Sequence, residues 1–142
     1  MFLLVCFTEM DDIYEQLSKE INDGKAKGCI VTLIGDFNCK VGAVIKGNCK
    51  DSTWAGKRLL KMNKDEKMTL MNATDKCRGT WTRSENGKNS ILDYMLLSKG
   101  CEEIIKELVI DEDKELAPLR VRTKNREEEL VYSDHNVHAF FL

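Results

Sequence analysis

Long hydrophobic runs are absent from this sequence. The first apolar stretch, residues 2–7, has no basic residue in front of it and leads into the acidic residues Glu9, Asp11 and Asp12. A secretory signal needs a basic start and a longer apolar centre, and a membrane-spanning helix needs about 20 apolar residues. The sequence therefore predicts an intracellular protein, nuclear or cytoplasmic, that has no membrane segment.

Closely spaced cysteines and histidines are also missing. The sequence holds six cysteines and two histidines, and none of the cysteines belongs to a C-x-x-C pair. Zinc sites and small disulfide-stapled domains both depend on such spacing. We therefore expect neither class, and we expect the cysteines to be reduced.

A surplus of basic residues is likewise missing. Lysine and arginine number 22 against 24 aspartates and glutamates, which gives a formal net charge of −2. Proteins that bind nucleic acid usually neutralise its phosphates with a basic surface. Only a local patch can do so here, and the candidate patch holds Arg120, Arg122, Lys124 and Arg126. Such a charge run is more often an ordinary solvated loop.

Proline is scarce, but apolar residues are plentiful. Proline occurs once and glycine nine times in 142 residues, whereas 42% of the residues are hydrophobic. This composition excludes collagen-like and wholly disordered chains, and it supplies enough apolar material for one core. We therefore expect a single domain over residues 1–142.

Hydrophobic periodicity predicts alternating strands and helices. Thr8 and Asp11 have the spacing of a capping box for a helix whose apolar positions run from Ile13 to Ile21, and Gly24 is expected to end that helix. The other expected elements are strands over residues 2–7, 29–34, 68–71, 108–110 and 137–142, a long loop over 37–54, a helix over 56–65, a helical turn at 104–105 and an exposed loop over 111–126. Interleaved strands and helices without an internal repeat indicate an α/β or α+β protein with a layered sheet.

A β-hairpin is the clearest local prediction. Asn86-Gly87 lies between two strand-like segments, residues 79–83 and 90–97. This dipeptide is the strongest short hairpin signal, because both residues readily adopt the left-handed conformation that a tight two-residue turn requires.

Three short segments place polar residues where strands are expected to end, which is where sheet proteins usually present reactive groups. The first segment is Gly35-Asp36-Phe37-Asn38. Asp36 and Asn38 are two residues apart and therefore point to the same side of an extended chain. An Asx turn that simply ends the strand is the alternative interpretation.

The second segment is the strand over residues 91–97. A period of two places Asp93 on the same face as Ile91 and Met95, and a carboxylate among apolar side chains needs a partner. We expect Asp93 to accept a hydrogen bond from a histidine and to fix its tautomer. The alternative is an exposed aspartate on an edge strand.

The third segment is Ser133-Asp134-His135, just before the last expected strand. Asp134 and His135 are adjacent, so both reach one site only where the chain bends. The other histidine, His138, would not share the face of His135 in a strand. A loop histidine without a chemical role is the alternative.

Taken together, these segments occur in the order and spacing of a known family. With Thr80-Trp81 before the second segment, and with Lys40-Val41-Gly42 and residues 56–60 after the first, the sequence resembles the endonuclease/exonuclease/phosphatase superfamily over about residues 10–142. That superfamily includes abasic-site endonucleases, pancreatic-type deoxyribonucleases and inositol polyphosphate phosphatases. Within it, the chain is most similar to the endonuclease domains of non-LTR (LINE-type) retrotransposons and to craniofacial-development-protein-like derivatives. The resemblance implies an α+β fold, a two-layer β-sandwich flanked by helices.

The resemblance also implies an activity, the metal-dependent hydrolysis of phosphodiester bonds in DNA. It implies that Asp36 orients the attacking water and that Asn38 binds the scissile phosphate. It further implies that Asp93 orients His135, which stabilises the charge that develops on the phosphate.

Two further residues receive roles from the resemblance. Asp134 would lie beside a weakly bound Mg²⁺, or Mn²⁺ in its place, because both ions prefer oxygen ligands. Trp81 would line the nucleic-acid cleft, and a core position is the alternative for this side chain.

The chain departs from the family pattern on its N-terminal side. The family domain has an N-terminal half that supplies a strand-end asparagine and the glutamate that anchors the catalytic metal, and neither has a counterpart here. The resemblance therefore covers only the C-terminal half to two thirds of the domain, which predicts weak metal binding, impaired activity and an incompletely covered sheet. The partners that it implies are DNA, a missing N-terminal half and a reverse transcriptase module, and no membrane.

Two other functions remain open from the sequence. One is a non-catalytic remnant that binds nucleic acid or a protein partner through the former cleft. The other is a phosphoinositide or nucleotide phosphatase of the same superfamily.

The sequence makes two predictions that a structure can test. The residues Asp36, Asn38, Asp93 and His135 should converge at one end of the sheet, with Asp93 within hydrogen-bond distance of His135. The side chains expected in the core include Ile30, Leu33, Leu92 and Phe140.

Overall fold

The computed structural model describes residues 2–5, 13–47, 50–116, 119–122, 128–131, 134–136 and 138–142. Its helices are α1 (Ile13–Ala26) and α2 (Trp54–Asp65), and short 3-10 turns lie at Gly42–Val44, Met71–Ala73 and Glu102–Ile104. The strands are β1 (Phe2–Val5), β2 (Ile30–Asp36), β3 (Met68–Leu70), β4 (Cys77–Arg78), β5 (Arg83–Glu85), β6 (Lys88–Ser90), β7 (Asp93–Ser98), β8 (Glu107–Ile110), β9 (Leu119–Arg122), β10 (Glu128–Val131) and β11 (His138–Phe141).

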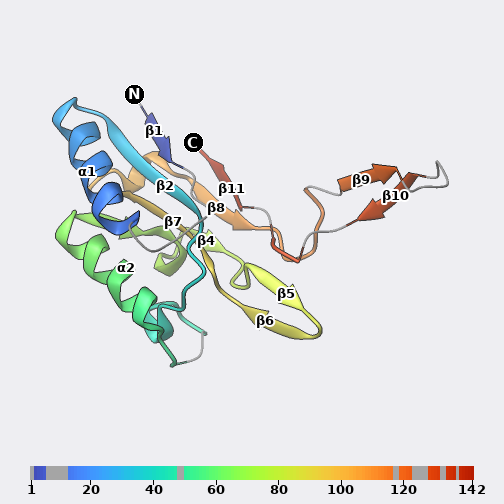
Figure 1. Cartoon of the computed structure of the whole chain (residues 1–142). Coiled ribbons are helices and arrows are strands. Elements are labelled where there is room, and N and C mark those ends of the chain that lie inside the picture. Colours follow the sequence, from blue (N-terminus) through green and yellow to red (C-terminus); the bar gives the residue numbers. More distant parts are fainter. Residues whose placement is uncertain are drawn as a thin grey trace.

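Two sheets and a pair of helices form the layers of the molecule (Figure 1). The larger sheet has the strand order β1-β2-β7-β3, and the smaller sheet has the order β11-β8-β4. The helices pack on one face of the larger sheet, and the smaller sheet lies against its other face. This arrangement confirms the predicted α+β class with layered sheets and flanking helices.

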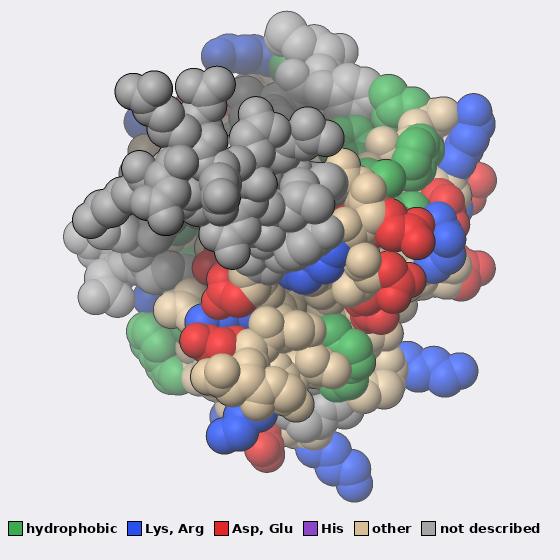
Figure 2. Space-filling view, turned by 90° about the vertical axis from the view of Figure 1, so that its right-hand side faces the viewer, with side chains coloured by type: hydrophobic (Ala, Val, Ile, Leu, Met, Phe, Trp, Pro, Cys, Tyr) green, Lys and Arg blue, Asp and Glu red, His purple; other side chains and the backbone are tan. Residues whose placement is uncertain are grey.

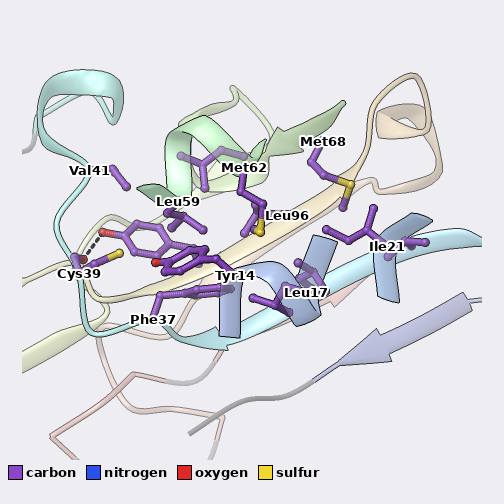
Figure 3. Packing of buried hydrophobic residues seen from close by; sticks show 14 of the residues in the cluster. Tyr14, Leu17, Ile21, Phe37, Cys39, Val41, Leu59, Met62, Met68 and Leu96 are labelled. Carbon is purple, nitrogen blue, oxygen red and sulfur yellow. Dashed lines mark hydrogen bonds between the residues drawn. The ribbon is translucent and has the colours of Figure 1, made fainter. Parts of the chain in front are cut away.

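The first apolar core fills the space between the helices and the larger sheet. It contains Leu17 and Ile21 of α1, Leu59 of α2, Leu33 of β2 and Leu96 of β7, all of them buried (Figure 3). Leu17 and Ile21 are four residues apart and therefore lie on one face of the helix. The four-residue spacing of apolar residues that predicted α1 therefore reflects the packing of this helix face on the sheet.

The second core lies between the two sheets. Met95 and Leu97 of β7 meet Leu108 of β8 there, together with Met71 and Ile105. Alternate residues of a strand point to opposite faces of its sheet. Because β7 has a core on each face, its apolar run shows no polar alternation.

The loop between β2 and α2 is held against β7 and against the start of α2. The hydroxyl of Tyr94 lies 2.7 Å from the carbonyl oxygen of Cys39 (Figure 3), and the hydroxyl of Thr53 accepts the N–H groups of Gly56 and Lys40, each at 3.1 Å. A Cβ atom on Gly56 would lie 1.8 Å from the carbonyl oxygen of Lys40. Only glycine allows this close approach, which fixes the chain that follows the end of β2.

The end of α1 differs from the prediction. The helix continues through Gly24, and the left-handed residue is Gly28, with φ 74°. The N–H of Cys29 donates to the carbonyl of Gly24 and that of Gly28 to Lys25, which is the hydrogen-bond pattern of a Schellman cap. The predicted capping residues Thr8 and Asp11 lie outside the described residues.

Other predicted elements fit with small shifts. The helix expected at 56 begins at Trp54, and β2 continues past Gly35 to Asp36. The Asn86-Gly87 turn joins β5 to β6 with positive φ at both residues, which confirms the hairpin.

The loop expected over residues 111–126 is wrong in part. Arg120 and Arg122 lie in β9, which pairs with β10 in an antiparallel hairpin that projects from the sheets (Figure 1). Lys124 and Arg126 lie outside the described residues. The sequence between β9 and β10 contains no glycine and no Asn-Gly pair that would have predicted a hairpin.

The predicted core residues divide into two groups. Leu33 and Leu92 are buried, and Ile30 is half-buried against the second core. Phe140 is 37% exposed, so its placement in the core was wrong. It lies on β11, which has a neighbour on one side only in the sheet that the structure describes.

Two predicted absences concern the described residues alone. Neither α1 nor α2 is long and apolar enough to cross a membrane. The four cysteines in the part of the chain that the structure describes, Cys29, Cys39, Cys77 and Cys101, are free thiols, as expected.

Candidate active site

Two carboxylates meet at one end of the larger sheet. Asp36 is the last residue of β2 and Asp93 is the first residue of β7. The two strands are antiparallel, and their register places Asp36 directly opposite Asp93. Because β7 lies between β2 and β3, the alternative of an edge-strand aspartate is wrong.

A histidine reaches this end from the far C-terminal part of the chain. His135 pairs with Arg83 in an isolated antiparallel bridge beside β5. The N–H of Ser84 donates to the carbonyl of Asp134 at 2.8 Å, and the N–H of Asn136 donates to that of Thr82 at 2.7 Å. The hairpin that begins with β5 therefore holds residues 134–136 beside the start of β7.

The predicted contact between His135 and Asp93 is present. Nδ1 of His135 lies 2.9 Å and 3.1 Å from the two carboxylate oxygens of Asp93, whose side chain is 14% exposed. An ionised carboxylate can only accept, so Nδ1 carries the proton and donates it. Nε2 then faces Asp36, whose Oδ2 atom lies 3.8 Å away.

The Asx turn at Asp36 is also present. The N–H of Asn38 donates to Oδ1 of Asp36 at 2.7 Å, and Asn38 has a positive φ of 46°. This bond orients the Asp36 carboxylate and leaves its Oδ2 directed at His135. The turn and the site are therefore compatible, since the turn sets the direction of the carboxylate. The side chain of Asn38 is exposed and lies next to this group in the chain.

Asp134 is bonded to Arg83, and its place beside a metal ion stays a prediction. Its Oδ2 atom accepts a hydrogen bond from Nε of Arg83 at 2.7 Å, and Nη2 of Arg83 donates to Glu85 at 2.7 Å. The hydrogen bond from Arg83 lowers the pKa of Asp134 and raises that of the guanidinium. In this structure Arg83 supplies the positive charge beside Asp134.

The donor set of the site fits a small divalent cation. Asp36, Asp93 and His135 each offer one ligand atom, and these atoms lie within 4.8 Å of one another. Carboxylate oxygens suit Mg²⁺ and Mn²⁺, and an imidazole nitrogen is tolerated by Mn²⁺. The group does not include Asp134.

Trp81 lies beside the site with its backbone bonded on both sides. Its N–H donates to Glu112 at 2.6 Å, its carbonyl accepts from the side chain of Asn136, and its half-buried ring packs against the first core. These contacts agree with the alternative that Trp81 is a core aromatic.

The other histidine is close to the pair but differently placed. His138 is largely buried on β11, and its Nε2 atom has no hydrogen-bond partner among the described residues. Burial lowers the pKa of His138, the nearby charge of Asp93 opposes that shift, and His135 adds to it. His138 is therefore neutral at neutral pH.

Two residues of the site were missed by the sequence reasoning. Thr82 is fully buried and accepts the N–H groups of Leu92 and Asp93 on its hydroxyl, and Arg83 binds Asp134. Threonine is a common strand residue, so Thr82 gives no signal by type. Arg83 lies just before the hairpin turn, and its spacing to Asp134 becomes visible only once the hairpin is placed.

The surface around the hairpins carries both signs of charge. Figure 2 shows the side from which the hairpins project, and acidic and basic side chains of the described residues are interspersed on it. This agrees with the net charge of −2. A continuous basic surface is not visible on the described part of this face.

The comparisons with known proteins concern the fold. No family model and no curated protein matches the sequence. The endonuclease domain of TRAS1, a telomere-specific non-LTR retrotransposon, is similar in structure with a TM-score of 0.58 and 23% identity, over 96% of this chain and 55% of that one. A 3'-5' exonuclease (NExo) from Neisseria meningitidis matches with a TM-score of 0.60 and 15% identity, over 90% of this chain and 51% of that one.

These likenesses show an endonuclease/exonuclease/phosphatase-like fold, as the sequence resemblance predicted. The chain spans about half the length of each of the two solved structures.

Proposed function

We propose that this chain is a nuclease domain of the retrotransposon type, which hydrolyses phosphodiester bonds of DNA with the help of a divalent metal ion. The observation that carries the proposal is the hydrogen bond between His135 and Asp93 beside the carboxylate of Asp36. The shared fold with an endonuclease domain and an exonuclease supports it.

The proposed reaction is the attack of water on a phosphodiester. Asp36 accepts the proton of the water as the new P–O bond forms, and the P–O bond to the leaving nucleotide breaks. The side chain of Asn38, and Nε2 of His135 when it also carries a proton, donate to the phosphate oxygens on which charge develops, and the leaving oxygen takes its proton from solvent water. Asp93 holds the ring of His135 in place through Nδ1.

The metal is proposed as Mg²⁺, with Mn²⁺ as a substitute. Asp36 of the group formed by Asp36, Asp93 and His135 would hold it, with Asp134 beside it, and it would polarise a phosphoryl oxygen when bound. Because Arg83 already binds Asp134, the site would hold the metal weakly.

We further propose that residues 1–142 form one domain and that this chain by itself has weak activity. The chain spans about half of the solved nucleases, and the resemblance assigns the metal-anchoring glutamate to the half that it does not match. A reverse transcriptase module and an intracellular location, nuclear or cytoplasmic, belong to the same proposal.

The test is the nicking of supercoiled plasmid in Mg²⁺ and in Mn²⁺ by three proteins. These are the chain itself, a chimera that carries the N-terminal half of an intact relative, and that chimera with His135→Ala. We expect feeble nicking by the chain and clear nicking by the chimera. We expect His135→Ala to lower the rate about 100-fold, because its imidazole acts on the charged transition state.

The exposed substitution Lys19→Ala in the chimera is the control and should leave the rate unchanged. Strong nicking by the chain that Asp36→Ala and His135→Ala leave undiminished would show that the site lies elsewhere. Release of inorganic phosphate from an inositol phosphate or a nucleotide, without nicking, would favour a phosphatase instead.

A non-catalytic protein that binds DNA is the second candidate, and the ion pair between Arg83 and Asp134, which occupies a carboxylate expected beside the metal, favours it. Binding of a DNA duplex in the presence of a chelator, with no nicking by the chimera, would support this second function.

A further inference from the structure

We propose that Thr82 is a positioning residue, whose buried hydroxyl sets the place of Asp93 and thereby the tautomer of His135. This inference rests on the proposed function only for its activity measurement, since the contacts are independent of any reaction.

The hydroxyl of Thr82 holds the start of β7. The side chain is fully buried, and its Oγ1 atom accepts the N–H of Leu92 at 2.9 Å and that of Asp93 at 3.1 Å. Both donors lie in the two residues that precede or begin the strand. The backbone that carries the Asp93 carboxylate is therefore anchored by one side chain.

The backbone of Thr82 holds the histidine segment. Its carbonyl accepts the N–H of Asn136, the residue after His135, at 2.7 Å, and its own N–H donates to Ser90 at 3.0 Å. Asn136 is buried as well, and its side chain donates to the carbonyl of Trp81. Thr82 is thus bonded both to the backbone of Asp93 and to the backbone of Asn136, the residue that follows His135.

This double contact has a chemical consequence. The bond from Nδ1 of His135 to Asp93 selects the tautomer in which Nδ1 carries the proton and Nε2 faces Asp36. If the Thr82 hydroxyl is removed, the N–H groups of Leu92 and Asp93 lose their acceptor in a buried place and must turn to find another. Such a turn moves the carboxylate, and small displacements in an active site cost large factors in rate.

The test compares Thr82→Val, which keeps the shape and removes the hydroxyl, with Thr82→Ser, which keeps the hydroxyl. Long-range ¹H–¹⁵N spectra of the full chain report which ring nitrogen of each histidine is protonated, and His138→Gln assigns the two histidines. We expect the Nδ1–H tautomer of His135 in the unaltered chain and in Thr82→Ser. We expect a mixture of tautomers in Thr82→Val.

Thr32→Val is the matched control. Thr32 is also a buried threonine of the sheet region, and its Oγ1 atom has no hydrogen-bond partner among the described residues. This substitution should leave the His135 tautomer unchanged. An unaltered tautomer in folded Thr82→Val would overturn the proposal.

If Thr82→Val does not fold, Thr82→Ser decides the question. A folded Thr82→Ser protein with a changed His135 tautomer would also overturn the proposal, because the hydroxyl would then be insufficient.

Measuring nicking together with the His135 tautomer distinguishes a failure of the positioning role from a failure of the proposed function. In the nicking chimera we expect Thr82→Val to lower kcat about tenfold with KM nearly unchanged, and Thr82→Ser to restore it. A chimera that never nicks, with the tautomers as expected, defeats the proposed function and leaves the positioning role intact. A chimera that nicks, with kcat and tautomer unmoved in Thr82→Val, defeats the positioning role alone.

Discussion

At the scale of single residues, the ion pair between Arg83 and Asp134 keeps the Asp134 carboxylate ionised to a lower pH than an ordinary aspartate. The hydrogen bond from Arg83 lowers the pKa of Asp134 below its ordinary value of 3.8. A lowered pKa in the folded chain means that this contact stabilises the fold above the ordinary pKa and is lost as the pH falls through the lowered one. Both side chains are partly exposed, so the stabilisation is small.

We therefore predict that Arg83→Gln raises the pKa of Asp134 towards 3.8, as measured by a carboxyl NMR titration. Glu85→Gln is the control, because it removes the other partner of Arg83 and leaves the bond to Asp134. An Asp134 pKa that is the same with and without Arg83 would contradict this account of the ion pair.

His138 also makes the stability of the fold decrease at low pH, in this case because the folded state favours the neutral side chain. Burial lowers its pKa below 6.5, so the unfolded chain binds more protons than the folded chain just below that pH. The stability from neutral His138 is fully present above about pH 6.5 and declines as the pH falls. We predict that His138→Gln reduces the difference in Tm between about pH 7.5 and about pH 5. An unchanged difference, with Lys19→Ala as the reference, would argue against a buried neutral imidazole.

Some residues of the site could be predicted from the sequence and others could not. Asp93 was found because a carboxylate in an apolar strand needs a partner, and the structure supplies His135. Thr82 and Arg83 act through a backbone bridge and an ion pair with residues 134–136, which no local pattern encodes. Long-range pairing of this kind depends on the finished fold.

At the scale of elements, the contact between α2 and the loop after β2 depends on one missing side chain. A Cβ atom on Gly56 would lie 1.8 Å from the backbone oxygen of Lys40, which cannot rotate away. Alanine would gain about 1 kcal/mol in helix propensity, but the clash costs about 1–3 kcal/mol or more. We predict that Gly56→Ala lowers the free energy of unfolding in urea.

Lys57→Ala tests the same turn of α2 without a clash. Lys57 is exposed, so we expect a change within about 0.5 kcal/mol. If Gly56→Ala proves neutral or stabilising, the loop is free to move away from the helix.

Some elements are determined by adjacent residues, and others by residues far away in the sequence. The hairpin at Asn86-Gly87 was predictable because its turn depends on two adjacent residues. The position of the α1 terminus depends on Gly28, which was passed over in favour of Gly24. The exposure of Phe140 depends on the neighbours of β11, which the sequence of β11 does not specify.

At the scale of the whole molecule, the two cores share one strand. Leu96 faces the helices and Leu97 faces the smaller sheet, and both are completely buried. We predict that Leu96→Ala and Leu97→Ala each lower the free energy of unfolding by about 2–5 kcal/mol. Because β7 couples the cores, urea unfolding should remain one transition when followed by fluorescence and by circular dichroism. Two separate transitions would show that the layers unfold independently.

The layered architecture was predictable as a class, because apolar strands alternate with amphipathic helices along the chain. The exposure of individual residues at the strand edges was not. Phe140 and Phe141 stay exposed on β11, and the chain spans about half of each of the two solved nucleases. Which strand edges are covered depends on the fold of the whole domain and on any other chain or segment that packs against it.

The two tryptophans give the protein an optical reporter of its own site. Trp54 is 70% exposed with the guanidinium of Arg58 over its ring, so its emission resembles that of indole in water whether the chain is folded or not. Trp81 is half-buried and bonded through its backbone to Asn136, next to His135. In a Trp54→Phe protein, the emission wavelength and the polarisation of Trp81 fluorescence would therefore report whether residues 134–136 are ordered.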